Sequence, residues 1–78
     1  MASMFTRRHY TAVADTIGLT LRQIDRTRDT DSFKAVSALA IAGFIENLTV
    51  TFKEDNGKFN EHRFDTRIEL IRDEGLQS

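Results

Sequence analysis

The chain has 78 residues, of which 11 are basic and 12 acidic, and it contains no cysteine and no proline. A chain of this length forms one domain and buries only about 60% of its unfolded surface. Without cysteine it has neither a disulfide nor a thiolate metal site to support the core, and its near-balanced charge argues against a strongly basic nucleic-acid coat. We therefore expect self-association, most simply as a homodimer.

Residues 1–6 contain no apolar segment of the kind that signal peptides carry. No apolar run in the sequence is expected to reach the roughly 20 residues of a membrane span. The sequence therefore predicts a cytoplasmic protein that does not contact a membrane.

The first expected helix covers about residues 7–26 and opens with an aromatic–cap–aromatic phrase. Thr6 is a good N-cap, and Phe5 and Tyr10 have the spacing of a hydrophobic staple. At about 100° per residue, one apolar stripe forms along this helix. Its members are Tyr10, Val13, Ala14, Ile17, Leu21 and Ile24.

The second expected helix covers about residues 33–55, after the polar linker 27–31, with Asp31 or Ser32 as its cap. Its main stripe contains Ser37, Ala38, Ile41, Phe44, Ile45, Leu48 and Phe52, and a second apolar side contains Val36, Leu39, Gly43 and Val50. A helix that is apolar on two faces is buried on two sides. This helix is therefore expected either at the centre of the bundle or at the seam of a dimer.

Residues 47–64 also allow an interpretation as a β-hairpin. The segment 48–52 alternates and is rich in β-branched residues, and Asn56-Gly57 is a strong hairpin signal. In the helical interpretation the same two residues end the second helix, because both tolerate a left-handed cap. The continuous helical stripe before them favours the helix.

The third expected helix covers about residues 61–74 and repeats the opening phrase, with Asn60 as the cap, Phe59 and Phe64 as the staple, and Gly75 as the stop. The predicted fold is an all-α, three-helix domain with a long central helix, dimeric through that helix. The expected core is Tyr10, Val13, Ile17, Leu21, Ile24, Ile41, Phe44, Ile45, Leu48, Phe52, Phe64 and Ile68. Replacing Phe44 or Phe64 with Ala should cost about 3–5 kcal/mol if they are buried.

These segments resemble a group of short, uncharacterised phage- and prophage-encoded proteins. The resemblance is carried by Met-Phe-Thr-x-x-His-Tyr over 4–10, Phe-x-x-Asp-Asn over 52–56, and Phe-x-x-x-Arg-Phe over 59–64. It spans most of the chain but involves about a dozen positions, and Gly57 stands where the pattern has proline. The resemblance implies a phage origin, a bacterial host cell and an all-α architecture, and it carries no catalytic residue over to this chain.

No enzymatic motif occurs in the sequence. His9 and His62 lack the spacing of metal ligands, and each is interpreted as a polar residue in the first turn of its helix. Gly18 and Gly43 stand alone inside helices, where packing clearance is the expected reason for glycine. We therefore predict a non-enzymatic protein with no catalytic, cofactor-binding or metal-binding residue.

Residues 1–28 contain five arginines against two acidic residues. Arg8, Arg22 and Arg26 are expected with Asp15 on the face of the first helix opposite its apolar stripe. The candidate partner-binding residues are Arg7, Arg8, Arg22, Arg26, Arg28, Val36, Leu39 and Val50. The leading hypothesis is a small phage protein that binds another protein, such as a host factor or a component of host defence. The alternatives are a nucleic-acid-binding module that uses the arginines and a self-assembling structural component.

Overall fold

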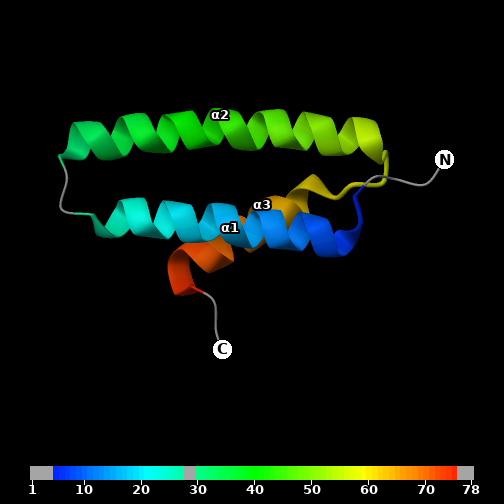
Figure 1. Cartoon of the computed structure of the whole chain (residues 1–78), viewed down its shortest axis with the longest axis horizontal. Helices are drawn as coiled ribbons and strands as arrows, with labels where there is room; N and C mark the ends of the chain where they lie inside the picture. Colours follow the sequence, from blue (N-terminus) through cyan, green and yellow to red (C-terminus); the bar gives the residue numbers. More distant parts are fainter. Residues whose placement is uncertain (1–4, 28–29, 76–78) are drawn as a thin grey trace.

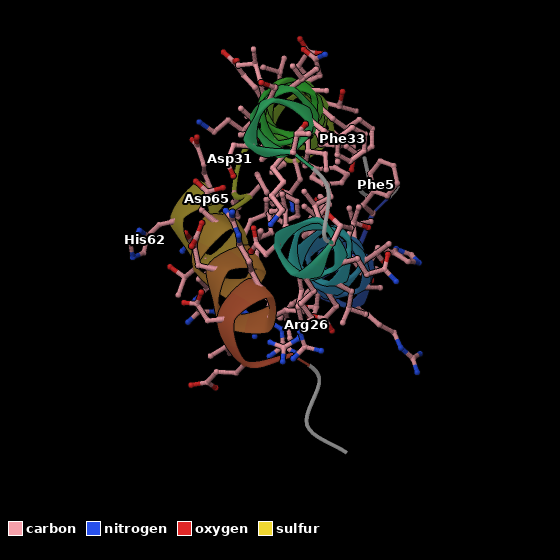
Figure 2. All side chains as sticks on the ribbon, turned by 90° about the vertical axis from the view of Figure 1, so that its left-hand side faces the viewer. Phe5, Arg26, Asp31, Phe33, His62 and Asp65 are labelled. Carbon is pink, nitrogen blue, oxygen red and sulfur yellow. The ribbon has the colours of Figure 1, made fainter. Side chains whose placement is uncertain are left out.

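The computed structural model describes residues 5–27 and 30–75, and over these residues the protein is all-α. The helices are α1 (Arg7–Arg26), α2 (Asp31–Asp55) and α3 (Glu61–Glu74). Figure 1 shows α2 running antiparallel to α1 along one side of the molecule, with α3 crossing behind α1. Viewed end-on, α1 and α3 lie next to each other beneath α2 (Figure 2).

α2 begins two residues earlier than the sequence predicts, because Thr30 rather than Asp31 or Ser32 is its N-cap. The backbone N–H of Phe33 donates to Thr30 Oγ1 at 3.2 Å. The hairpin interpretation of 47–64 is wrong, since residues 47–55 continue α2 and residues 61–64 begin α3. The longer helical periodicity on either side of this segment, and not its local β-branched pattern, determines its structure.

The turn after α2 is closed by a side chain and not by a left-handed cap. Asn56 has φ −144°, and Gly75 is the one residue with positive φ in the described part of the chain. Asn56 Oδ1 accepts from the backbone N–H of Lys58 at 3.0 Å, and the Asn56 carbonyl accepts from the N–H of Phe59 at 2.9 Å. Asn56 therefore ends α2 as predicted, but the expected left-handed cap is wrong, because the asparagine side chain makes the turn itself.

Five aromatic rings from three regions of the chain form one cluster, which we call the aromatic cluster. Its members are Phe5, Tyr10, Phe52, Phe59 and Phe64. Phe52 is 1% exposed, and its ring centroid lies 4.8–5.7 Å from those of the other four. The two predicted staple pairs are present, at 6.3 Å for Phe5–Tyr10 and 5.5 Å for Phe59–Phe64. Most pairs are tilted or edge-on, the arrangement that aromatic quadrupoles favour.

α1 and α3 cross in close contact at Gly18. A Cβ at this position would lie 2.6 Å from Ile71 Cβ and 2.9 Å from the carbonyl oxygen of Ile68. Ala14, Ile17, Ile68 and Ile71 are buried around this crossing. Packing clearance at Gly18 is therefore confirmed, and α3 takes the place against α1 that a side chain would otherwise fill.

Phe44 was expected in the core and is 56% exposed instead, so its predicted burial is wrong. The central position of α2 is also not confirmed, because α1 is the helix whose backbone lies close to both others. Ile41, Ile45 and Leu48 of the same stripe are half-buried and pack against the core, whereas Phe44 lies at the edge of the stripe and faces solvent. Thr49 and Phe52 are the buried residues of α2.

By length and composition alone α2 is apolar enough to cross a membrane, which the sequence analysis did not expect of any segment. It is the one such helix among residues 5–27 and 30–75. Core helices of soluble proteins have the same composition, but they are mostly buried, whereas only 11% of the apolar window of α2 is buried. α2 therefore has more apolar residues than are buried by packing within one chain.

Candidate interaction surfaces

The most apolar exposed surface belongs to α2, on the side that faces away from α1 and α3. Val36 is 67% exposed, Leu39 75% and Val50 51%. With Gly43 they lie at spacings of three, four and seven residues, which places them along one side of a helix. We call Val36, Leu39, Gly43 and Val50 the outer face of α2.

Gly43 has no packing role within the chain. No heavy atom of the described residues lies within 4 Å of the position that a Cβ would take there, apart from its own surroundings in the helix. Glycine inside a helix costs about 1 kcal/mol relative to alanine. The sequence predicts packing clearance at Gly43, but neither α1 nor α3 packs into the space that this glycine leaves.

The arginines that the sequence singles out do not form one surface. Arg7 and Arg8 are exposed at the start of α1, and Arg26 is exposed at its end, which by helical rise is about 28 Å away. Arg22 Nη1 donates to the carbonyl oxygens of Arg72 and Asp73 at the end of α3, at 3.3 and 2.9 Å. Arg28 lies outside the described residues.

One side of α1 that was expected to face solvent instead contacts α3. Arg67 donates two hydrogen bonds to the Asp15 carboxylate, at 2.5 and 3.2 Å, and Arg22 contacts the C-terminal carbonyls as above. The expectation that Asp15 and Arg22 lie on a solvated face is therefore wrong. α3 packs on this side because Ala14 and Gly18 leave room there for a second backbone.

A second ionic contact joins the C-terminal ends of α1 and α3. Arg72 donates to both carboxylate oxygens of Asp25, at 2.8 and 3.0 Å. This hydrogen bonding from Arg72 lowers the pKa of Asp25, and the same bond raises the pKa of Arg72. The hydrogen bond to Asp15 likewise raises the pKa of Arg67. Bidentate pairs of this geometry fix the register of the two helices.

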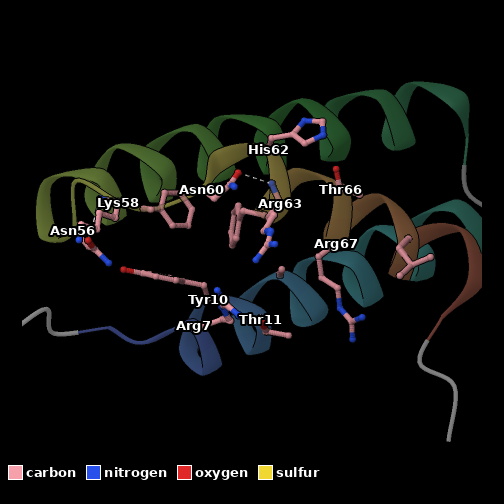
Figure 3. A pocket seen from close by; sticks show the side chains of 14 residues that line it. Arg7, Tyr10, Thr11, Asn56, Lys58, Asn60, His62, Arg63, Thr66 and Arg67 are labelled. Carbon is pink, nitrogen blue, oxygen red and sulfur yellow. Dashed lines mark hydrogen bonds between the residues drawn. The ribbon is translucent and has the colours of Figure 1, made fainter.

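A cleft of about 690 Å³ lies between the first turns of α1 and α3 (Figure 3). Its inner wall is aromatic and aliphatic, with Tyr10, Phe59, Phe64 and Leu70. Its basic lining residues are Arg7, Lys58, His62, Arg63 and Arg67, and the described residues that line it include no acidic side chain. Of these residues only Arg7 is a partner-binding residue predicted from the sequence, because Arg7 and Arg63 are far apart in the chain and the α1–α3 packing brings them to one cleft.

Tyr10 brings a polar atom to the apolar wall of this cleft. Its hydroxyl oxygen is buried and has no hydrogen-bond partner among the described residues. In Figure 3 the hydroxyl points toward the end of the cleft that Asn56 and Lys58 line. A buried hydroxyl without a partner is costly and uncommon in folded proteins.

The two histidines have different surroundings. His9 Nδ1 accepts from the backbone N–H of Thr6 at 3.0 Å, so this histidine takes the role that Glu or Gln plays in a capping box. His62 is exposed and points away from the other helices in Figure 2. No cluster of three or more metal-ligating side chains occurs among residues 5–27 and 30–75.

No protein-family model, no curated protein and no solved structure matches this chain. The outer face of α2 and the cleft are therefore the two features of the molecule that indicate a function.

Proposed function

We propose that this protein is a non-enzymatic interaction module that forms an antiparallel homodimer through the outer face of α2. The observation that carries the proposal is the exposure of Val36, Leu39 and Val50 on a 25-residue helix that is apolar along most of its length. A surface of this kind on a small protein is typical of a protein–protein contact.

The outer face is self-complementary when two copies run antiparallel with Gly43 at the two-fold axis. In that register Val36 of one copy lies opposite Val50 of the other, since both are seven residues from Gly43. The absent side chain at Gly43 lets the two backbones approach closely at the centre. A two-fold dimer uses the same patch on both copies. The space beside Gly43, which is empty in the single chain, would then be filled by the backbone of the second copy.

A protein partner fits the outer face better than a lipid bilayer does. Glu46 is exposed near the middle of the apolar part of α2, between Gly43 and Val50. A carboxylate at that depth in a membrane costs about 2.5–3.5 kcal/mol on insertion scales. At the edge of a helix pair the same carboxylate remains in water.

The wider role that we propose follows the resemblance to short phage proteins. The dimer would present α1 and α3 to a host protein, such as a component of host defence, in the bacterial cytoplasm. Support for this part comes from the resemblance. Mass spectrometry after affinity capture from host cells tests it, with a dimer-disrupting variant as the matched sample.

The dimer is tested by sedimentation equilibrium of the full chain and of three variants. Val36→Lys and Val50→Glu should each lower dimerisation, because each buries a charge at the seam. In the antiparallel register the double variant places Lys at 36 opposite Glu at 50 of the second copy. It should recover most of the lost association, whereas a parallel pair places like charges together and gives no recovery.

Gln23→Lys on the exposed side of α1 is the matched control, since it adds one charge away from α2. It should leave the mass in solution unchanged. A monomeric wild-type protein at every concentration would overturn the dimer. Co-flotation of the wild-type protein with neutral lipid vesicles, lost in Val36→Lys, would assign the outer face to a membrane instead.

A further inference from the structure

We propose that the cleft between the first turns of α1 and α3 binds a small organic phosphate that carries a flat apolar group, a molecule of about mononucleotide size. The cleft volume of about 690 Å³ lies within the range of about 300–1,000 Å³ that small-molecule sites span. The cleft lies between α1 and α3 and includes no residue of the outer face of α2, so this proposal is independent of the dimer.

The charges of the cleft favour a phosphate. The guanidinium of Arg63 points into the cleft in Figure 3, Arg7 lies on the opposite wall, and Lys58 lines one end. Arg67, the fourth cation, is already neutralised by Asp15. Arg7, Lys58 and Arg63 have no acidic partner in the described chain, so a ligand with more than one negative charge fits this cleft best. A phosphate monoester supplies about −1.5 to −2 at neutral pH, and the arginine fork matches its oxygens.

The apolar wall favours a flat ring attached to that phosphate. Leu70 is 42% exposed although it lines the cleft, and Tyr10, which also lines it, is half-buried. A flat group placed there covers Leu70 and lies within reach of arginine side chains, whose planar heads stack on aromatic systems. Inorganic phosphate would satisfy the cations and leave this wall exposed.

The Tyr10 hydroxyl is a second, independent sign of a ligand. It is the one buried side-chain polar atom without a partner among the described residues, and it lies in a residue that lines the cleft. A ligand oxygen or ring nitrogen at that end of the cleft would accept its proton. Removing the hydroxyl should therefore weaken binding while leaving the fold intact.

Amide NMR titration of the full chain tests the proposal with two probes, adenosine monophosphate and naphthyl phosphate. At least one of them should shift the amides of Tyr10, Thr11 and Arg63 saturably. Adenosine and inorganic phosphate, each half of the first probe, should bind at least about tenfold more weakly, since each loses one set of contacts. No saturable shift around the cleft with either probe would overturn the proposal.

Variants locate the site. Arg63→Gln and Arg7→Gln should each weaken binding about tenfold, while Arg8→Gln, the neighbouring residue that does not line the cleft, should leave affinity unchanged. Tyr10→Phe should keep the unfolding midpoint and lose affinity. Equal losses from Arg7→Gln and Arg8→Gln would show general attraction of anions and contradict the cleft. Affinity for single-stranded oligonucleotides that grows with their length would replace the small ligand with nucleic acid.

Discussion

The two halves of α2 belong to the same helix and have opposite surroundings. Between Ile45 and Asp55 the helix buries Thr49 and Phe52 against α1 and the aromatic cluster, whereas no residue from Asp31 to Phe44 is buried. Both halves are rich in apolar side chains. Apolar character therefore predicts that a surface will be covered, and it does not say whether the cover comes from the same chain.

The difference arises from where the two staple phrases meet. Phe5 and Tyr10 at the start of α1, and Phe59 and Phe64 at the start of α3, gather around Phe52 and hold the end of α2. Further along the chain, Ile68 and Ile71 of α3 pack against α1, because Gly18 allows a close approach there. The first half of α2 is consequently left without a second neighbour.

The largest expected effect comes from replacing Phe52 with Ala. The side chain is 1% exposed at the centre of four rings, so the change should lower the free energy of unfolding by about 3–5 kcal/mol. Urea denaturation followed by circular dichroism measures it. Phe44→Ala is the matched variant in the other half, and at concentrations where the chain is monomeric it should change stability by only about 0.5 kcal/mol. Equal losses in the two variants would show that Phe44 is as well packed as Phe52.

The next effect concerns the crossing of α1 and α3. Gly18→Ala gains helix propensity but places Cβ 2.6 Å from Ile71 Cβ and 2.9 Å from the carbonyl oxygen of Ile68, so a buried side chain and a helix backbone must shift. We expect a net loss of about 1–2 kcal/mol, because overpacking costs typically about 1–3 kcal/mol and outweighs the propensity gain. Thermal unfolding measures the loss. A stability equal to wild type would mean that α3 sits further from α1.

Gly43→Ala is the counterpart of that substitution on α2 and should have the opposite sign. A Cβ meets no neighbour there, so the monomer should gain up to about 1 kcal/mol of stability. The same methyl group should weaken the homodimer by keeping the two backbones apart. Unfolding at low concentration and sedimentation equilibrium measure the two effects, and a stabilised variant that dimerises as well as wild type would contradict the proposed register.

The smallest effect is expected at the ionic contact of Asp25 with Arg72. The side chain of Asp25 is 45% exposed, so Asp25→Asn should cost less than about 1 kcal/mol. The pKa of Asp25 is lowered in the folded protein, so its contribution is present above the ordinary value of 3.8 and is lost as the pH falls through the folded pKa. The gap between wild type and variant should therefore close in acid and narrow in high salt. A gap that persists in acid would assign the loss to packing.

Local patterns predicted the helices well. Thr6, Asn60 and Gly75 mark ends of α1 and α3 as expected, because caps and staples depend on residues a few positions apart. The misplacement of Phe44 has a different origin, since periodicity identifies an apolar stripe but not which edge of it the neighbouring helices cover. Ile41 and Ile45 pack against the core on either side of Phe44, which stays exposed. The cleft was not predicted because Arg7, Lys58 and Arg63 come together only through α1–α3 packing.

Short-range sequence patterns are therefore enough to predict the helical architecture, the two aromatic phrases and the surplus of apolar residues on the second helix. These depend on hydrogen bonds and side-chain contacts within one or two helical turns. Long-range packing determines that both phrases converge on Phe52, that Asp15 and Arg22 face α3, and that the outer face of α2 stays exposed. Those outcomes depend on the angle at which α3 crosses α1, which is set by the clearance at Gly18 and by contacts between residues some 50 positions apart in the chain.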